Sequence, residues 1–186
     1  MENISSTPVT FELKPIAEQD RPALLTLYRQ CEDFIRLGSI APIDDAMVQT
    51  DLDISQRSRG IFLGIWLPDG VLAGVADYIP AGFEGMAECA FIELLMIGRP
   101  WRGRGLGAAV LKWIEQRVWK AAEVTALRIG VQVNNPQAIN FWEAHGFSRI
   151  GGPTLQPDGT VAYLYEKNKS LPASVEWPTI AGDKDD

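Results

Sequence analysis

The spacing of apolar positions changes several times along the chain, and each spacing predicts an element. Steps of three and four predict amphipathic helices, whereas alternation and short continuous apolar runs predict strands. Helices are expected from Asp20 as N-cap to before Gly38, and over 44–54, 105–122 and 136–144. Strands are expected over 10–16, 60–67, 71–80, 88–97, 126–133, 148–150 and 161–167.

The order of these elements predicts an α/β fold with a mixed, mostly antiparallel sheet and about four flanking helices. Pro68-Asp69-Gly70 and Pro157-Asp158-Gly159 are turn signals that predict two hairpins. Helices connect other strands, and helical crossovers allow parallel pairing. The run at 88–97 is almost entirely apolar, which predicts a central strand that is buried on both faces.

Length and composition narrow the class of protein. The chain has 186 residues with a net charge of −7, so we expect one domain over 10–168 with tails over 1–9 and 169–186. The acidic charge argues against nucleic-acid binding, and no apolar run or leader pattern predicts a membrane segment or export. Two cysteines without a CxxC spacing favour the reducing cytoplasm, and the single His145 argues against a metal centre.

A glycine-rich turn lies between the predicted central strand and the next helix. It reads Arg102-Gly103-Arg104-Gly105-Leu106-Gly107, with Arg99 just before it. Glycines let the backbone approach a ligand, and the start of a helix offers free N–H groups to an anion. The turn therefore indicates an anion site such as one for pyrophosphate; the alternative is a surface turn with solvated arginines. The spacing fits neither a P-loop nor a dinucleotide fingerprint.

Two motifs resemble those of the GNAT superfamily of N-acetyltransferases. Arg102, Gly105 and Gly107 fill the pattern R-x-x-G-x-G of that family's motif A. About thirty residues later, the segment Val133–Phe147 is similar to motif B, roughly N-x-x-A-I-x-F-Y-x-x-x-G-F. The resemblance implies a GNAT-like fold whose sheet splays apart at a site for acetyl-CoA, the acetyl donor, with no metal.

The resemblance also implies a set of cofactor-binding residues. Backbone N–H groups of the turn take the pyrophosphate, and the end of the central strand pairs with the pantetheine arm. Asn135 matches a side-chain contact to that arm, although it is equally suited to cap the following helix. The full set is Leu95, Met96, Ile97, Arg102, Gly103, Arg104, Gly105, Leu106, Gly107, Asn135, Phe141 and Trp142.

Acetyl transfer to an amine requires a proton acceptor, because a free alkylammonium has a pKa of about 10.4. Glu93 is the candidate, since a carboxylate in an otherwise apolar strand is costly without a purpose. The alternatives are that Glu93 pairs with an arginine or faces solvent, and that Glu88 or Asp77 is the base.

The family often has Tyr after the Phe of motif B, where its hydroxyl protonates the sulfur; here that residue is Trp142. Tyr163, Tyr165, a water or no group at all could supply the proton instead. Core packing also accounts for Phe141 and Trp142, and His145 is interpreted as a helix-end residue.

In the resembling family the acceptor site is built by the early helices and the loops beside the sheet. Here the corresponding segments, about 35–53 and 78–88, are rich in acids that would attract a cationic amine, unless they form an ordinary solvated surface. These acids, with Asp77 beside them, are Asp44, Asp45, Asp51, Asp53, Asp77, Glu84 and Glu88.

We therefore expect an acetyl-CoA-dependent N-acetyltransferase acting on a primary amine of a small molecule, peptide or protein. The alternative is a CoA-binding regulatory module of the same fold. The resemblance adds a homodimer as an expectation, although no residue pattern identifies an interface.

Overall fold

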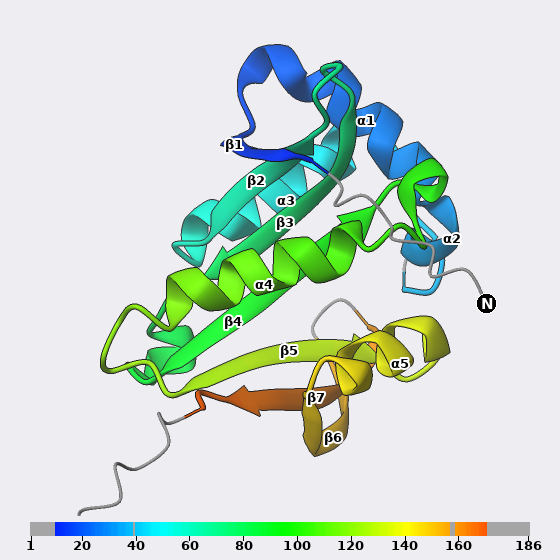
Figure 1. Ribbon diagram of the computed structural model, residues 1–186. Helices are drawn as coiled ribbons and strands as arrows, with labels where there is room; N and C mark the ends of the chain where they lie inside the picture. Colours follow the sequence, from blue (N-terminus) through cyan, green and yellow to red (C-terminus); the bar gives the residue numbers. More distant parts are fainter. Residues whose placement is uncertain (1–9, 39, 157–158, 171–186) are drawn as a thin grey trace, which may run out of the picture.

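The computed structural model describes residues 10–38, 40–156 and 159–170, and a single sheet runs through them (Figure 1). The sheet has seven strands in the order β1-β2-β3-β4-β5-β7-β6. The strands are β1 Glu12–Pro15, β2 Ile61–Trp66, β3 Leu72–Ile79, β4 Cys89–Ile97, β5 Ala126–Gln132, β6 Ser148–Leu155 and β7 Val161–Asn168. Every neighbouring pair is antiparallel except β4 and β5, so the prediction of a mixed, mostly antiparallel sheet is confirmed.

The parallel pair is short. β4 and β5 pair from Cys89↔Ala126 to Ile92↔Ile129. Beyond that point β4 continues to Ile97 against β3, and β5 continues to Gln132 against β7. The two strands therefore diverge after Ile92, as Figure 1 shows, and the predicted splay of the sheet is present.

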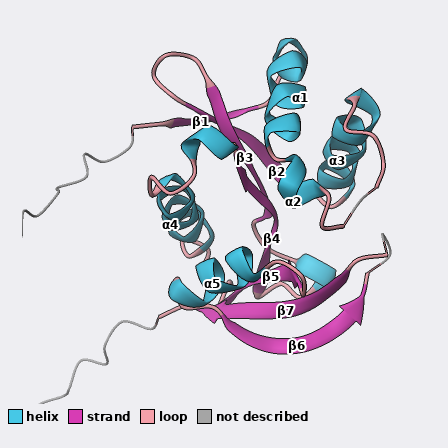
Figure 2. Cartoon of the chain, turned by 90° about the vertical axis from the view of Figure 1, so that its right-hand side faces the viewer, coloured by secondary structure: helices cyan, strands magenta, loops and turns pink. Residues whose placement is uncertain are grey.

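Helices cover both faces of the sheet (Figure 2). The α-helices are α1 Arg21–Gln30, α2 Glu32–Ile35, α3 Asp45–Arg57, α4 Leu106–Val118 and α5 Pro136–Ala144. One hydrophobic core lies under α4 and α5 and includes Val110, Ile114 and Trp142. A second core lies under α1 and α3 and includes Leu24, Leu27 and Val48. Among the described residues, no helix combines the length and the hydropathy that crossing a bilayer requires.

A bulge interrupts the register between β3 and β4. Tyr78 pairs with Ile92, whereas the adjacent Asp77 pairs with Leu94, so Glu93 is the extra residue on β4. Such a bulge breaks the regular alternation of side chains and turns one of them out of the sheet. The prediction that this strand is buried on both faces is therefore wrong at Glu93, which is exposed although Cys89–Ile92 are buried.

Two other expectations about local structure need correction. The helix expected up to Gly38 is broken at Cys31, where φ is −103° and ψ is 19°. Asp20 is the residue before α1, but its carboxylate accepts from the Ala17 N–H at 2.9 Å and does not cap α1, because a short 3₁₀ turn over Glu18–Asp20 precedes the helix.

β6 also differs from the expectation. It extends to Leu155, beyond the predicted end at 150, because register shifts on both sides of Gly151 accommodate the glycines. The predicted tail over 1–9 lies outside the described residues, as do Pro157 and Asp158 of the second turn and residues 171–186 of the second tail.

Candidate active site

The divergence of β4 and β5 leaves an open edge inside the sheet. From Leu94 to Ile97, β4 pairs with β3 on one side, and on the other side the segment from Glu93 to Ile97 pairs with no strand among the described residues. An unpaired strand edge presents N–H and C=O groups that bind an extended ligand as another strand would. This edge is where the resemblance expects the pantetheine arm.

A cavity of about 470 Å³ adjoins this edge on the face of α4 and α5. It is lined by every expected cofactor-binding residue except Arg104: by Leu95, Met96, Ile97, Arg102, Gly103, Gly105, Leu106, Gly107, Asn135, Phe141 and Trp142. Arg104 is exposed, and its guanidinium lies over the Trp101 ring, 5.1 Å from the centroid. The backbone of Arg104 is still part of the turn, but its side chain is outside the cavity.

The glycine turn has the conformation that its sequence indicates. Gly103 and Gly105 have φ values of 73° and 79°, in the left-handed region that favours glycine. Gly105 is the N-cap of α4, and a Cβ atom on either glycine would meet no atom within 4 Å. The backbone N–H groups from Gly103 to Gly107 donate to no backbone carbonyl among the described residues, and they lie at the positive end of the α4 dipole.

Arg102 is held by the protein itself. Its Nη1 and Nη2 donate to the Asp33 carboxylate at 2.5 and 3.1 Å, and its Nε donates to the Ile97 carbonyl at 2.8 Å. Arg99 also approaches Asp33, at 3.7 Å. Asp33 therefore neutralises part of the positive charge that the sequence assigned to the turn, and the remaining anion-binding groups are mainly backbone N–H groups.

Motif B forms the other wall of this cavity. Asn135 accepts the Ala138 N–H through Oδ1 at 3.0 Å, so its role as a helix cap is confirmed. Trp142 is 4% exposed and packs edge-on against Phe141 and Phe147, as expected for core residues. His145 ends α5, and its Nδ1 is 2.7 Å from the Phe141 carbonyl oxygen.

The two tyrosines considered as proton donors lie away from this site. Tyr165 is buried on β7 and donates to Glu143 Oε1 at 3.0 Å. Tyr163 packs its ring under the Arg149 guanidinium, 4.6 Å from the centroid. Neither residue lines a cavity that adjoins the open edge.

Glu93 lies at the bulge, one residue before the part of β4 that lines the cavities. The pKa of Glu93 is raised above its ordinary value of 4.5, first by desolvation and then by the nearby charge of Asp77. Asp77 is 3% exposed, and its Oδ1 accepts from the Ser55 hydroxyl at 2.8 Å. Neither acid lines a cavity; the Glu93 side chain is exposed, with its carboxyl group partly desolvated by its surroundings, and the next residue, Leu94, lines the second cavity.

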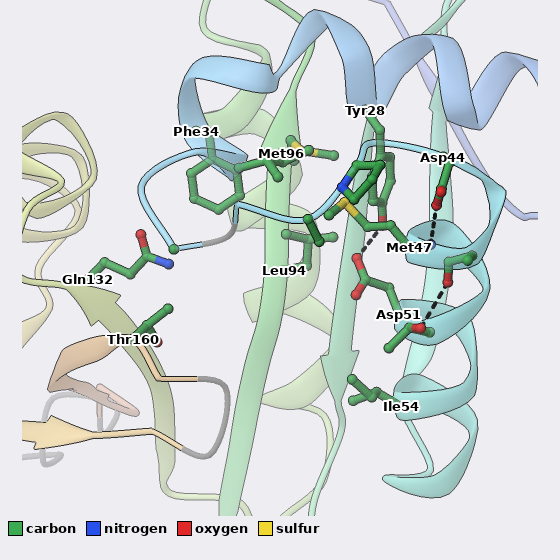
Figure 3. Close-up of a pocket in the computed structure, with 16 residues that line it drawn as sticks. Tyr28, Phe34, Asp44, Met47, Asp51, Ile54, Leu94, Met96, Gln132 and Thr160 are labelled. Carbon is green, nitrogen blue, oxygen red and sulfur yellow. Dashed lines mark hydrogen bonds between the residues drawn. The ribbon is translucent and has the colours of Figure 1, made fainter.

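A second cavity, of about 540 Å³, opens on the opposite face of the sheet (Figure 3). Its walls come from α1, α2, α3, the segment between α2 and α3, the ends of β4 and β5, and Thr160. Leu94 and Met96 line this cavity, and Leu95 and Ile97 line the first one, as the alternation of side chains along a strand predicts; Met96 also contributes to the first cavity. Phe34 also contributes to both cavities, so the two adjoin at the open edge of β4.

Tyr28 and Asp51 form a hydrogen-bonded pair in the second cavity. The Tyr28 hydroxyl donates to Asp51 Oδ2 at 2.6 Å (Figure 3). Burial raises the pKa of both groups. Tyr28 lines this cavity, and its sequence position did not indicate this, because a residue in the apolar stripe of α1 is also expected in the core.

The acids expected around an acceptor site separate into groups. Asp44 and Asp51 line the second cavity, and Asp77 is buried behind it. The remaining acids are exposed and do not line it: Asp45, Asp53, Glu84 and Glu88. For these four, the interpretation as a solvated surface is the better one.

Comparisons with known proteins agree with this architecture. The sequence pattern of the acetyltransferase (GNAT) family matches residues 22–147. A protein of Bacillus subtilis (strain 168), the uncharacterized N-acetyltransferase YesJ, is 27% identical over 112 residues, which are 55% of this chain and 59% of that protein. The chain thus aligns with about three fifths of the length of this relative.

Solved structures share the fold. An acetyltransferase from Thermus thermophilus superposes with a TM-score of 0.70 at 23% identity, over 87% of this chain and 98% of that one. PaiA N-acetyltransferase from Thermoplasma acidophilum, solved in complex with coenzyme A, has a TM-score of 0.63 at 16% identity, over 86% and 99%. The ribosomal-protein-S18-alanine N-acetyltransferase from Escherichia coli has a TM-score of 0.61 at 17% identity, over 90% and 99%.

The family match covers more than half of the chain, and it includes the glycine turn, the open edge of β4 and the whole of motif B. The expected family and fold are both confirmed by this match and by the superpositions. The chain belongs to the GNAT family of acetyltransferases.

Proposed function

We propose that the protein transfers an acetyl group from acetyl-CoA to a primary amine. The observation that carries the proposal is the meeting of two cavities at the unpaired edge of β4, with Met96 and Phe34 common to both. A donor in one cavity and an acceptor in the other can come into contact only through this gap. Such an arrangement holds two reactants next to each other and keeps their other parts separate.

The cavity beside α4 and α5 suits the donor. Backbone N–H groups from Gly103 to Gly107 have no backbone acceptor among the described residues and can bind a pyrophosphate, and the Glu93–Ile97 edge is free to pair with the amides of an extended arm. Because Asn135 uses Oδ1 for its helix cap, its Nδ2 is the atom available to the arm. When bound here, acetyl-CoA supplies a thioester whose carbonyl carbon is open to attack by an amine.

The β4 edge then has two tasks. Its N–H groups stabilise the negative charge that develops on the carbonyl oxygen during transfer. Glu93 accepts the ammonium proton through a bridging water, because its exposed position at the bulge lies one residue from Leu94 in the acceptor cavity. Desolvation and Asp77 raise the pKa of Glu93, which brings its basicity closer to that needed near neutral pH.

No tyrosine replaces the missing motif B hydroxyl in this proposal. Trp142 is packed in the core, and Tyr163 and Tyr165 lie elsewhere, so a water protonates the departing sulfur. The donor cavity is open to solvent along the glycine turn, where Gly103 and Gly105 have open space around them.

The test is a panel of primary amines with acetyl-CoA, followed by the release of free CoA thiol. We expect CoA to raise the melting temperature and at least one amine to release thiol faster than acetyl-CoA hydrolyses. Absence of thiol release with every amine, while CoA still stabilises the protein, would overturn the transferase function. Absence of CoA binding would also overturn the assignment of the donor cavity.

A further inference from the structure

Asp51 is a partly buried carboxylate without a cationic partner. Among the described residues, its hydrogen bond comes from the Tyr28 hydroxyl to Oδ2, and no Lys, Arg or His side chain forms an ion pair with it. Oδ1 therefore remains available inside the cavity. A carboxylate held in an apolar cavity is costly unless a cation meets it, and the bound ligand is the remaining source of that cation.

Asp44, the other acid in the lining, is less suited to this role. It is exposed, and its Oδ1 already accepts from the Met47 N–H at 3.1 Å as the N-cap of α3. Asp51 is thus the acid in the cavity that has both partial burial and an uncommitted oxygen.

Asp51 does not lie where acetyl transfer takes place. In Figure 3 it lies on the α3 side of β4, whereas Gln132, at the end of β5, lies on the other side next to the opening; Leu94 and Met96 are between them. The Gln132 Oε1 atom is buried and has no hydrogen-bond partner among the described residues. Because a terminal amide turns at low cost, Gln132 can accept from an N–H at the transfer end.

The space between these two ends is apolar. Met47, Ile54, Leu94 and Met96 contribute hydrocarbon and thioether surface, and Phe34 adds an aromatic ring. The residues identified as lining this cavity include no Lys, Arg or His, so a carboxylate on the acceptor would meet Asp51 and Asp44 without a compensating cation. Methylene groups suit this surface, whereas an anionic group does not.

The geometry points to an acceptor with two nitrogens, a reacting primary amine at the open edge of β4 and a second, cationic nitrogen bound by Asp51 across an apolar spacer. This inference rests on the proposed function and names its substrate class as α,ω-alkanediamines and molecules that contain them. Tyr28 positions the Asp51 carboxylate, and Gln132 accepts from the reacting end.

The test compares three acceptors of the same length with acetyl-CoA: 1,5-diaminopentane, n-pentylamine and 5-aminopentanoate. The diamine should exceed n-pentylamine in kcat/KM by at least about tenfold, the usual effect of one charge-assisted hydrogen bond. The aminopentanoate should be the poorest of the three. In Asp51→Asn the ratio of diamine to monoamine should fall towards one.

Asp53→Asn is the matched control. Asp53 lies on the same helix and the substitution removes the same charge, but Asp53 is exposed, accepts from Gln49 at 2.7 Å and does not line the cavity. The ratio in this variant should stay at the wild-type value. Because each ratio compares two substrates of one protein, a partial loss of folded enzyme cancels.

Several outcomes would overturn the inference while the transferase function stands. They are equal kcat/KM values for diamine and monoamine in the wild type, an unchanged ratio in Asp51→Asn, and an equal fall in Asp53→Asn. If no amine reacts, the inference is tested by calorimetric titration of the CoA-bound protein with 1,5-diaminopentane, which measures binding without turnover. Binding that Asp51→Asn abolishes supports the inference, and absence of binding overturns it. Failure to bind CoA itself would instead contradict the proposed function.

Discussion

Arg102 and Asp33 form a two-point ion pair that fastens the glycine turn to α2, with Nη1–Oδ2 and Nη2–Oδ1 distances of 2.5 and 3.1 Å. The same guanidinium bonds to the Ile97 carbonyl at the end of β4. One side chain thus joins the strand, the turn and the helix that surround the donor cavity. Its hydrogen bonds lower the pKa of Asp33 below its ordinary value of 3.8.

This ion pair makes stability depend on pH at the acidic end. Since the pKa of Asp33 is lowered in the folded protein, its contribution is complete above the ordinary value of 3.8 and disappears as pH falls through the folded value. The side chains are 31% and 42% exposed, so about 1 kcal/mol is the most that we expect from the pair.

Asp33→Asn should therefore lower Tm by about 2–4 °C at neutral pH and have little effect in strong acid. Thermal melts across pH measure the difference. Glu18→Gln, which removes an exposed acid that forms no ion pair among the described residues, serves as the control. A loss of Tm in Asp33→Asn that is the same at every pH would contradict the prediction.

Gly105→Asp should block the donor cavity. The new side chain would point its bulk and negative charge at the place proposed for the pyrophosphate, so CoA affinity should fall by at least about tenfold. Gly70→Asp is the matched control, because Gly70 also has a positive φ of 82°, with no atom within 4 Å of a Cβ, but lies in the β2–β3 hairpin.

Both glycine variants should lose about 1 kcal/mol of stability from the left-handed conformation, whereas Gly105→Asp alone should lose affinity. Calorimetric titration with CoA, combined with thermal melts, separates the two effects. If the CoA affinity of Gly105→Asp is unchanged, the pyrophosphate does not bind at this turn.

Glu93→Gln should lower kcat and leave CoA affinity intact. Glu93 must be deprotonated to accept a proton, and its pKa is raised above 4.5, so the wild-type rate should increase as pH rises through that elevated value. The amide cannot titrate, so the variant should lose this increase. Glu123→Gln, at an exposed position away from both cavities, should retain the wild-type profile. A Glu93→Gln enzyme with wild-type rates at every pH would show that the base is elsewhere.

Asp77→Asn should stabilise the protein near neutral pH. Burial raises the pKa of Asp77 above its ordinary value of 3.8, so the charged form is a penalty that appears as pH rises through the folded pKa. Asparagine keeps an oxygen for the Ser55 hydroxyl and carries no charge. We expect Tm to increase by about 2–4 °C, and the increase should shrink in acid, where wild-type Asp77 is protonated. If Asp77→Asn has a lower Tm than the wild type at neutral pH, the charged Asp77 carboxylate is not a net penalty to the folded protein.

The local structure of the glycine turn and of the cap before α5 could be predicted from sequence because its signals are local. The turn from Arg102 to Gly107 and the cap at Asn135 each depend on neighbouring residues in the sequence. Glycine in the turn indicates positive φ values, which Gly103 and Gly105 have. The break between α1 and α2 could not be predicted, because apolar spacing continues through Cys31 although the backbone does not. The bulge at Glu93 depends on pairing with β3, which no pattern within β4 encodes.

The acceptor cavity has no local signature. Tyr28 and Asp51 are 23 positions apart in sequence and meet because α1 and α3 pack on the same face of the sheet. Gln132 joins them from the end of β5. In isolation each of these residues resembles an ordinary core or surface position, and their chemistry depends on a tertiary arrangement that the sequence does not display.

Because the β4–β5 ladder ends early, one side of the site is formed by backbone atoms and the other by side chains, and the two differ in how they respond to mutation. The hydrogen-bonding groups of the open β4 edge are backbone atoms, so they are retained in any sequence that keeps the two strands extended. The opposite cavity is built from side chains, so a few substitutions on α1, α2 or α3 change its size and charge. Under the proposed function, binding of the donor would therefore tolerate wide substitution of the surrounding side chains, whereas single substitutions could change which acceptor is bound.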